Sequence, residues 1–219
     1  HAMDADGGRP QWQFGMSTWA FADRARMVLT YQQQGRWRLG TLDTAAGTWT
    51  PLAPDLEPGD NITATSSHAV LVAGSAAAPD AVVRIDLATG GVETIRAASE
   101  VAVDPGYVSS PEAIGFHTDN GRTAHAFFYA PRNQDYTGVG TERPPLVVIG
   151  HGGPTASTSA RLNLEVQYWT SRGFAVVDVN YRGSSGYGRA YRRELAGQWG
   201  IADVADCASA ADLCGAGGE

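Results

Sequence analysis

The sequence predicts an all-β segment of the β-propeller type followed by a segment of the α/β class. The first half repeats with a period of 43 residues, a typical length for a four-stranded propeller blade. The second half has two short apolar runs, Leu146–Ile149 and Phe174–Val179, separated by a segment long enough for a helix. Two buried strands joined by a helix form a right-handed crossover unit of a parallel sheet.

The repeat consists of a strand, an aspartate, a turn, a glycine and a second strand. Asp43 and Gly47 recur as Asp86 and Gly90 with the same offset. Two units cannot close a ring, because propellers need about four to eight blades. We therefore interpret this part as the last blades of a larger propeller, with a small antiparallel meander as the alternative. The expected strands are Arg26–Tyr31, Trp37–Leu42, Ala69–Ala73 and Ala81–Leu87.

Val108–Pro111 is the expected switch from the blades to the α/β segment. Glu112–His117 and Ala124–Ala130 are expected to form a hairpin, since Asn120-Gly121 between them favours a tight turn. His1-Ala2-Met3 is typical of a cloning remnant. The expected domains are residues 1–10 as remnant and leader, 11–107 as propeller blades and 108–219 as the α/β part.

Three further segments are expected to be helical. Ser159–Arg172 connects the two buried strands and ends at Gly173. Arg189–Trp199 follows the second strand, with Arg192 and Arg193 in solvent. Asp203–Leu213 comes next, with Gly215 as its stop.

Composition excludes several classes of function. The 219 residues include 43% hydrophobic residues and carry a net charge of −7, with no lysine. Nucleic-acid binding is disfavoured because no basic cluster exists, and no apolar run is long enough to span a membrane. Cys207 and Cys214 lie about 10 Å apart on the expected helix, too far for a disulfide. We expect a cytoplasmic protein without cofactor or metal.

A glycine-rich turn directly after the first buried strand carries the clearest chemical signal. His151, Gly152 and Gly153 precede Pro154 and fit the loop that supplies one N–H of the oxyanion hole in α/β-hydrolases. A tetrahedral intermediate places negative charge on a former carbonyl oxygen, and backbone donors must already point at it. Glycines let the backbone approach a substrate closely. A plain glycine turn is the alternative.

A second glycine-rich turn, Arg182–Gly188, follows the other buried strand at the same edge of the sheet, where ligands bind in α/β folds. Arg182 could bind a substrate carboxylate or carbonyl, or it could hold the loop by a salt bridge to a nearby aspartate. Tyr187 and Tyr191 could line a substrate pocket or pack in the core. All three are candidates for substrate binding.

Three stretches, HGGPTAS, SRGFAVVDVNYRGSSGYGRAYRREL and GQWGIADVAD, resemble the hydrolase domain of the prolyl oligopeptidase family of serine peptidases. The similarity is greatest to the acylaminoacyl-peptidase and dipeptidyl-aminopeptidase branch and is dense from Pro111 to Gly215. It implies an α/β-hydrolase domain, of which this is the N-terminal half, behind a propeller that screens access to the active site. It also implies that Gly153 donates its backbone N–H to the oxyanion, whereas His151 stands where some relatives have a tyrosine.

The resemblance places the catalytic triad outside this sequence. In this fold the nucleophile elbow, Gly-x-Ser-x-Gly, follows the helix expected at Asp203–Leu213, and the aspartate and histidine come later still. All three residues would lie beyond Glu219. Ser184 and Ser185 do not form the elbow pattern. We therefore expect the chain alone to be inactive and to need the remainder of the same protein.

The resemblance implies a serine peptidase that cleaves short peptides by acyl-enzyme chemistry, of the aminopeptidase, dipeptidyl- or acylaminoacyl-peptidase type. The expected partners are a peptide substrate and the rest of the protein, with a homo-oligomer as a further option. An esterase or amidase of the same fold is one alternative. A non-catalytic propeller–hydrolase binding module is another.

Overall fold

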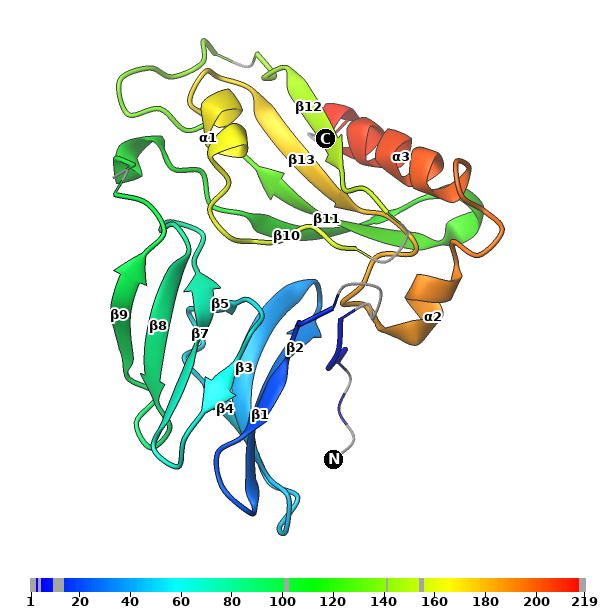
Figure 1. The fold of residues 1–219 in the computed structure, drawn as a ribbon. Coiled ribbons are helices and arrows are strands. Elements are labelled where there is room, and N and C mark those ends of the chain that lie inside the picture. The colour runs from blue at the N-terminus through cyan, green and yellow to red at the C-terminus, as the bar shows by residue number, and fades with distance from the viewer. Residues whose placement is uncertain are drawn as a thin grey trace.

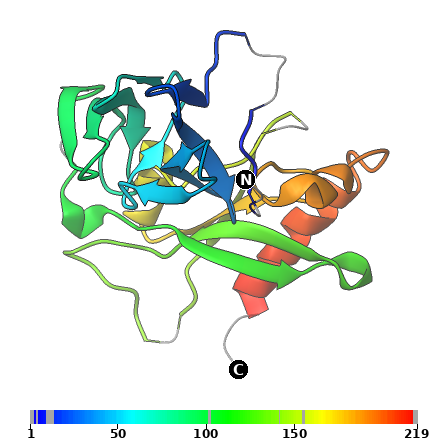
Figure 2. The same cartoon turned by 90° about the horizontal axis from the view of Figure 1, so that it is seen from below.

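The structure is a computed structural model that describes residues 3, 5–9, 14–100, 103–140, 142–153 and 156–216. Two antiparallel sheets form the first half of the chain, and a mixed sheet with three helices forms the second half (Figure 1). Figure 2 shows the two halves from below, with the N-terminal segment between them. This agrees with the prediction that an all-β part comes first and an α/β part follows it.

The first half consists of two antiparallel sheets, one of four strands and one of five. The first sheet has the order β1-β2-β3-β4, and in the second β5 and β6 both pair with β7, followed by β8 and β9. All pairings are antiparallel, and every predicted strand is present. The strands are β1 (Trp19–Phe21), β2 (Arg26–Gln33), β3 (Arg36–Asp43), β4 (Trp49–Leu52), β5 (Glu57–Pro58), β6 (Thr63–Ala64), β7 (His68–Gly74), β8 (Ala81–Asp86) and β9 (Val92–Ala97).

The sequence repeat corresponds to two turns with the same hydrogen bonds. The carboxylate of Asp43 accepts from two backbone N–H groups in the turn, at 2.9 and 2.8 Å, and Asp86 does the same at 2.9 and 2.8 Å. Gly47 and Gly90 close the turns at φ of 68° and 74°, a conformation that favours glycine. The 43-residue period therefore reflects a repeated β-hairpin.

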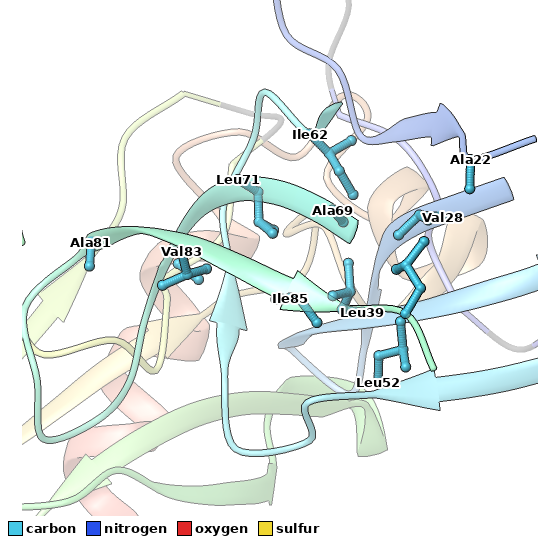
Figure 3. Packing of buried hydrophobic residues seen from close by; sticks show 12 residues of the cluster. Ala22, Val28, Leu39, Leu52, Ile62, Ala69, Leu71, Ala81, Val83 and Ile85 are labelled. Atoms are coloured by element: carbon cyan, nitrogen blue, oxygen red, sulfur yellow. The ribbon is translucent and has the colours of Figure 1, made fainter. Parts of the chain in front are cut away.

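The two sheets pack face to face through one apolar core (Figure 3). Val28 and Leu39 from the first sheet and Leu71, Val83 and Ile85 from the second are at most 3% exposed. Adjacent antiparallel sheets that share a core are the arrangement expected of neighbouring propeller blades.

The second half is built on a mixed sheet with the order β10-β11-β13-β12. β12 and β13 run parallel, whereas β10 with β11 and β11 with β13 run antiparallel. The predicted hairpin around Asn120-Gly121 and the predicted parallel pair are both confirmed. The strands are β10 (Glu112–His117), β11 (Thr123–Tyr129), β12 (Leu146–Gly150) and β13 (Ala175–Asn180), with single 3-10 turns at Pro105–Tyr107 (η1) and Asp119–Gly121 (η2).

Helices cover both faces of this sheet. One apolar cluster joins Val177 and Val179 to Ala210 of α3 (Ala202–Ala216), and the other joins Val176 to Val166 of α1 (Leu164–Thr170). Every residue of β13 is buried, which agrees with its mostly apolar sequence, and its two polar residues, Asp178 and Asn180, are buried with the rest.

The predicted helix boundaries need three corrections. α1 begins after Asn163 and not at Ser159, because the Asn163 side chain caps the helix by accepting from Glu165 N at 2.9 Å. α2 (Gly188–Arg193) is shorter than predicted and gives way to turns that include Gly197 at φ 71°. α3 continues through Gly215, since one glycine costs a long helix only about 1 kcal/mol.

Asp178 on β13 provides a test of the packing around α1. It is 7% exposed and accepts a hydrogen bond from the Thr158 hydroxyl. Burial raises the pKa of Asp178 to about 6, and the Thr158 hydrogen bond opposes this only in part. The folded protein therefore holds the proton between about pH 4 and pH 6, and the stability contributed by this carboxyl group falls as the pH rises through that range.

We expect Asp178→Asn to stabilise the protein at pH 8 by about 1–3 kcal/mol, because the variant removes a buried charge and keeps an acceptor for Thr158. The gain should shrink as the pH is lowered toward 4, where aspartate itself is neutral. Thermal unfolding of both proteins at pH 5 and pH 8 measures this difference. A lower melting temperature for the variant at pH 8 would contradict the assignment.

Candidate active site

Two glycine-rich turns meet at one edge of the mixed sheet. Because β12 and β13 are parallel, with Gly150 opposite Val179, both strands end at this edge. His151–Gly153 follows β12, and Arg182–Gly188 follows β13 shortly after the strand ends. The structure thus brings together the two turns that the sequence singled out.

The first turn leaves its glycines open. Gly152 and Gly153 are exposed, and a side chain added at either position would meet nothing within 4 Å. Gly153 has φ 68°, which favours glycine. Among the residues that the structure describes, none accepts a hydrogen bond from either glycine's N–H. Backbone donors at a strand end without an acceptor in the described part of the chain are an arrangement that can bind an anionic oxygen. Pro154 lies outside the described residues.

The His151 ring turns toward the second turn of the chain. Its Nε2 lies 2.7 Å from the Ser184 hydroxyl oxygen, and that hydroxyl donates to the Tyr181 carbonyl oxygen at 2.7 Å. Because the single hydroxyl proton goes to the carbonyl, His151 Nε2 must carry a proton and donate. Burial lowers the pKa of His151, so the ring is neutral at neutral pH. The ring therefore braces the loop through Ser184.

Tyr181 supports the same loop with its hydroxyl group. The hydroxyl donates to the His151 carbonyl oxygen at 2.7 Å and lies 3.3 Å from the Gly153 carbonyl oxygen. The rings of Tyr181 and His151 stack with their centroids 4.3 Å apart. Burial raises the pKa of Tyr181 to about 12, so the phenol keeps its proton at neutral pH. Sequence reasoning missed Tyr181 and Ser184 as supports, although both belong to the motif that carried the resemblance.

Arg182 forms ion pairs with two aspartates of the same chain. It is 6% exposed, and its guanidinium pairs with Asp206 at 2.8 Å and with Asp119. Asp206, on α3, is fully buried and also accepts from the backbone N–H of Arg182 at 2.7 Å. Of the two roles the sequence left open, these contacts support the structural one.

Tyr187 and Tyr191 pack around His125 of β11. The Tyr187 ring stacks on the His125 ring at 4.1 Å, and the Tyr191 ring lies 5.3 Å from it. Tyr191 is 7% exposed and donates to the Asn180 carbonyl oxygen at 2.7 Å. These contacts favour packing over a pocket lining for both tyrosines.

The chain is similar to proteins of one peptidase family. Residues 160–218 match the model of the prolyl oligopeptidase family. The chain is similar to the uncharacterized peptidase YuxL of Bacillus subtilis, with 31% identity over 48% of this chain and 15% of the relative. It is also similar to dipeptidyl aminopeptidase BIII of Pseudoxanthomonas mexicana, with 36% identity over 36% of this chain and 12% of the relative.

The solved structures resemble the chain over nearly its whole length. A puromycin hydrolase shares 39% identity with a TM-score of 0.91, covering 99% of this chain and 33% of that protein. The resemblance to the prolyl oligopeptidase family is confirmed. A puromycin-hydrolyzing peptidase of Mycobacterium tuberculosis shares 36% identity with a TM-score of 0.93, covering 99% of this chain and 34% of that protein. The chain therefore spans about a third of these structures and a smaller share of the curated relatives.

These likenesses identify the two halves of the fold. The two antiparallel sheets, of four and five strands, are propeller blades, and the mixed sheet is the first part of an α/β-hydrolase sheet, as the sequence predicted. No helix in the described part of the chain is long and apolar enough to cross a membrane. Both cysteines are free, and the described residues contain no group of three or more side chains suited to hold a metal ion.

Proposed function

We propose that the intact protein is a serine peptidase, in which this chain supplies the oxyanion-hole loop. The observation that carries the proposal is the open turn at Gly152 and Gly153, whose N–H groups lie at the ligand-binding edge of the sheet. The 39% identity to a puromycin hydrolase over 99% of the chain supports it.

In this proposal a serine outside the chain attacks the scissile carbonyl carbon and forms a tetrahedral intermediate. The negative oxygen receives hydrogen bonds from backbone N–H groups, with Gly153 as one donor. Collapse of the intermediate releases the amine and leaves an acyl-enzyme, which water then hydrolyses. His151, Tyr181 and Ser184 keep the loop in place through the hydrogen bonds that His151 makes with Ser184 and with the Tyr181 hydroxyl.

The proposed substrates are short peptides and small aminoacyl amides. Relatives are named as puromycin hydrolase, dipeptidyl aminopeptidase and acylamino-acid-releasing enzyme, and puromycin hydrolase gives the highest identity over the whole chain among the structures described above. Propeller blades in front of the hydrolase sheet favour small substrates, because a ring of blades restricts entry.

We also propose where the two domains of the protein meet. Residues 11–107 form the blades and residues 108–219 begin the hydrolase domain, with the rest of the same protein as the partner that supplies the triad. Residues 1–10, which the sequence sets apart as a leader, include Asp6, which pairs with β2 and belongs to the fold. The free cysteines fit a reducing, cytoplasmic location.

Hydrolysis assays test this function. We expect the intact protein to release amine from puromycin and from amino acid p-nitroanilides, and to be labelled by a fluorophosphonate probe. The chain of residues 1–219 should neither hydrolyse these substrates nor take up the probe. Labelling of this chain would overturn the placement of the nucleophile outside it. Cleavage of p-nitrophenyl esters without cleavage of amides would favour an esterase, and no labelling of the intact protein would favour a binding module.

A further inference from the structure

The N-terminal segment meets the hydrolase part at a point that the proposed mechanism does not use. Asp6 forms an antiparallel bridge with Gln32 of β2, with both backbone hydrogen bonds at 2.8 Å. In Figures 1 and 2 this segment lies between the blades and the loop that leads to α2. Asp6 therefore connects β2 of the first blade with the second glycine-rich turn, since Gly186 N donates to its carboxylate.

The carboxylate of Asp6 binds that turn with one oxygen and α2 with the other. One oxygen accepts from Gly186 N at 2.9 Å and from Gly188 N at 3.1 Å. The other pairs with the guanidinium of Arg192, on α2. The Asp6 side chain is only 13% exposed. Arg192, which the sequence placed in solvent, is thus paired with Asp6, and its side chain is 33% exposed.

The β2–β3 hairpin holds the same turn from the other side. Gly35 N donates to the Gly186 carbonyl oxygen at 3.3 Å. The buried amide of Gln32 donates to Ser157 at 2.9 Å, and a side chain at Gly186 would overlap with Gln32. The turn is therefore fitted closely between the blade and the carboxylate, and it cannot shift without breaking these contacts.

The Arg182–Gly188 turn also contains the residue that supports the candidate oxyanion loop, His151–Gly153. Ser184 lies two residues before Gly186, and its hydroxyl receives the hydrogen bond from His151. Ser185 N donates to the Ala156 carbonyl oxygen at 2.9 Å, just beyond that loop. A displacement of the turn would therefore reach the loop through two short connections.

We propose that Asp6 is a positioning residue for the oxyanion loop. It fixes the Ser184–Gly188 turn, and the turn in turn holds His151 in the orientation that leaves the Gly153 N–H free. The inference rests on the proposed function for its effect on catalysis. The clamp, by which we mean the contacts of Asp6 with Gly186, Gly188 and Arg192, is seen in the structure and does not depend on that function.

The test is Asp6→Asn in the intact protein, assayed with an amino acid p-nitroanilide. We expect kcat to fall about ten- to a hundredfold with KM within twofold, because a small misplacement of a catalytic donor is costly. Asp23→Asn is the matched control, since the Asp23 carboxylate also accepts from two backbone N–H groups and pairs with an arginine, but on a turn of the blades. The control should keep wild-type kinetics.

Hydrogen–deuterium exchange separates this inference from the proposed function. Asp6→Asn should speed exchange in peptides covering residues 183–190 and also in those covering 150–158, with a melting temperature near that of the wild type. Arg192→Met, which keeps the two glycine contacts, should give a smaller effect of the same kind. An inactive wild type would refute the peptidase proposal while the exchange data still test the clamp. Unchanged kcat, or faster exchange confined to residues 183–190, would overturn the positioning role.

Discussion

Replacing Gly153 by proline should lower kcat/KM of the intact protein by about a hundred- to a thousandfold, the usual cost of removing one oxyanion donor. Proline has no backbone N–H, so the variant cannot donate to the negative oxygen. The loss should appear in kcat, because the hydrogen bond becomes strong only as charge develops on the oxygen. Steady-state kinetics with puromycin or a p-nitroanilide measure both constants.

Gly153→Ala is a partial control for this variant, because proline also fixes φ near −65° and cannot adopt the 68° of Gly153. Alanine also disfavours the φ of 68°, at about 1–2 kcal/mol, but it keeps the N–H and its methyl group would enter open space. We therefore expect a much smaller loss for alanine than for proline. Equal losses in both variants would assign the effect to backbone strain and remove Gly153 from the oxyanion hole.

The second large effect is expected from Arg182→Met. This change leaves the fully buried carboxylate of Asp206 without its partner, and breaking a buried ion pair typically costs about 3–5 kcal/mol. The melting temperature should fall markedly, while the KM of the protein that remains folded should change little. The opposite pattern, a higher KM with normal stability, would show that Arg182 binds substrate after all.

A double variant separates charge from packing at this site. Arg182→Met combined with Asp206→Leu removes both charges, and apolar replacement of a buried pair is often close to neutral. Part of the lost stability should return, limited by the hydrogen bonds that Asp206 accepts from Thr118 and from Arg182 N. A double variant less stable than Arg182→Met alone would argue against an uncompensated charge as the cause.

The parts of the fold that the sequence predicted well depend on short-range chemistry. Asn120-Gly121 lies at positive φ in the hairpin turn, as the dipeptide indicated. Asp43 and Asp86 bind the N–H groups of their own turns, so the repeat could be read from neighbouring residues alone. The place of the His151–Gly153 turn followed from the apolar run before it.

What the sequence could not predict depends on contacts between distant segments. Asp6 and Gly186 are 180 positions apart, and no periodicity relates them. The support that Tyr181 gives to His151 depends on how two parallel strands align. The start of α1 was misplaced because Ser159 and Asn163 are both good caps, and only the fold decides between them.

In the proposed mechanism the Gly153 N–H points at the oxygen of a tetrahedral intermediate. A structure of the intact protein carrying a peptide boronic acid or aldehyde on its nucleophilic serine measures this directly. We predict that the oxygen of the adduct lies about 2.7–3.1 Å from Gly153 N, with the His151–Ser184 hydrogen bond intact. An adduct oxygen that points away from the His151–Gly153 turn and takes its donors elsewhere would contradict the account.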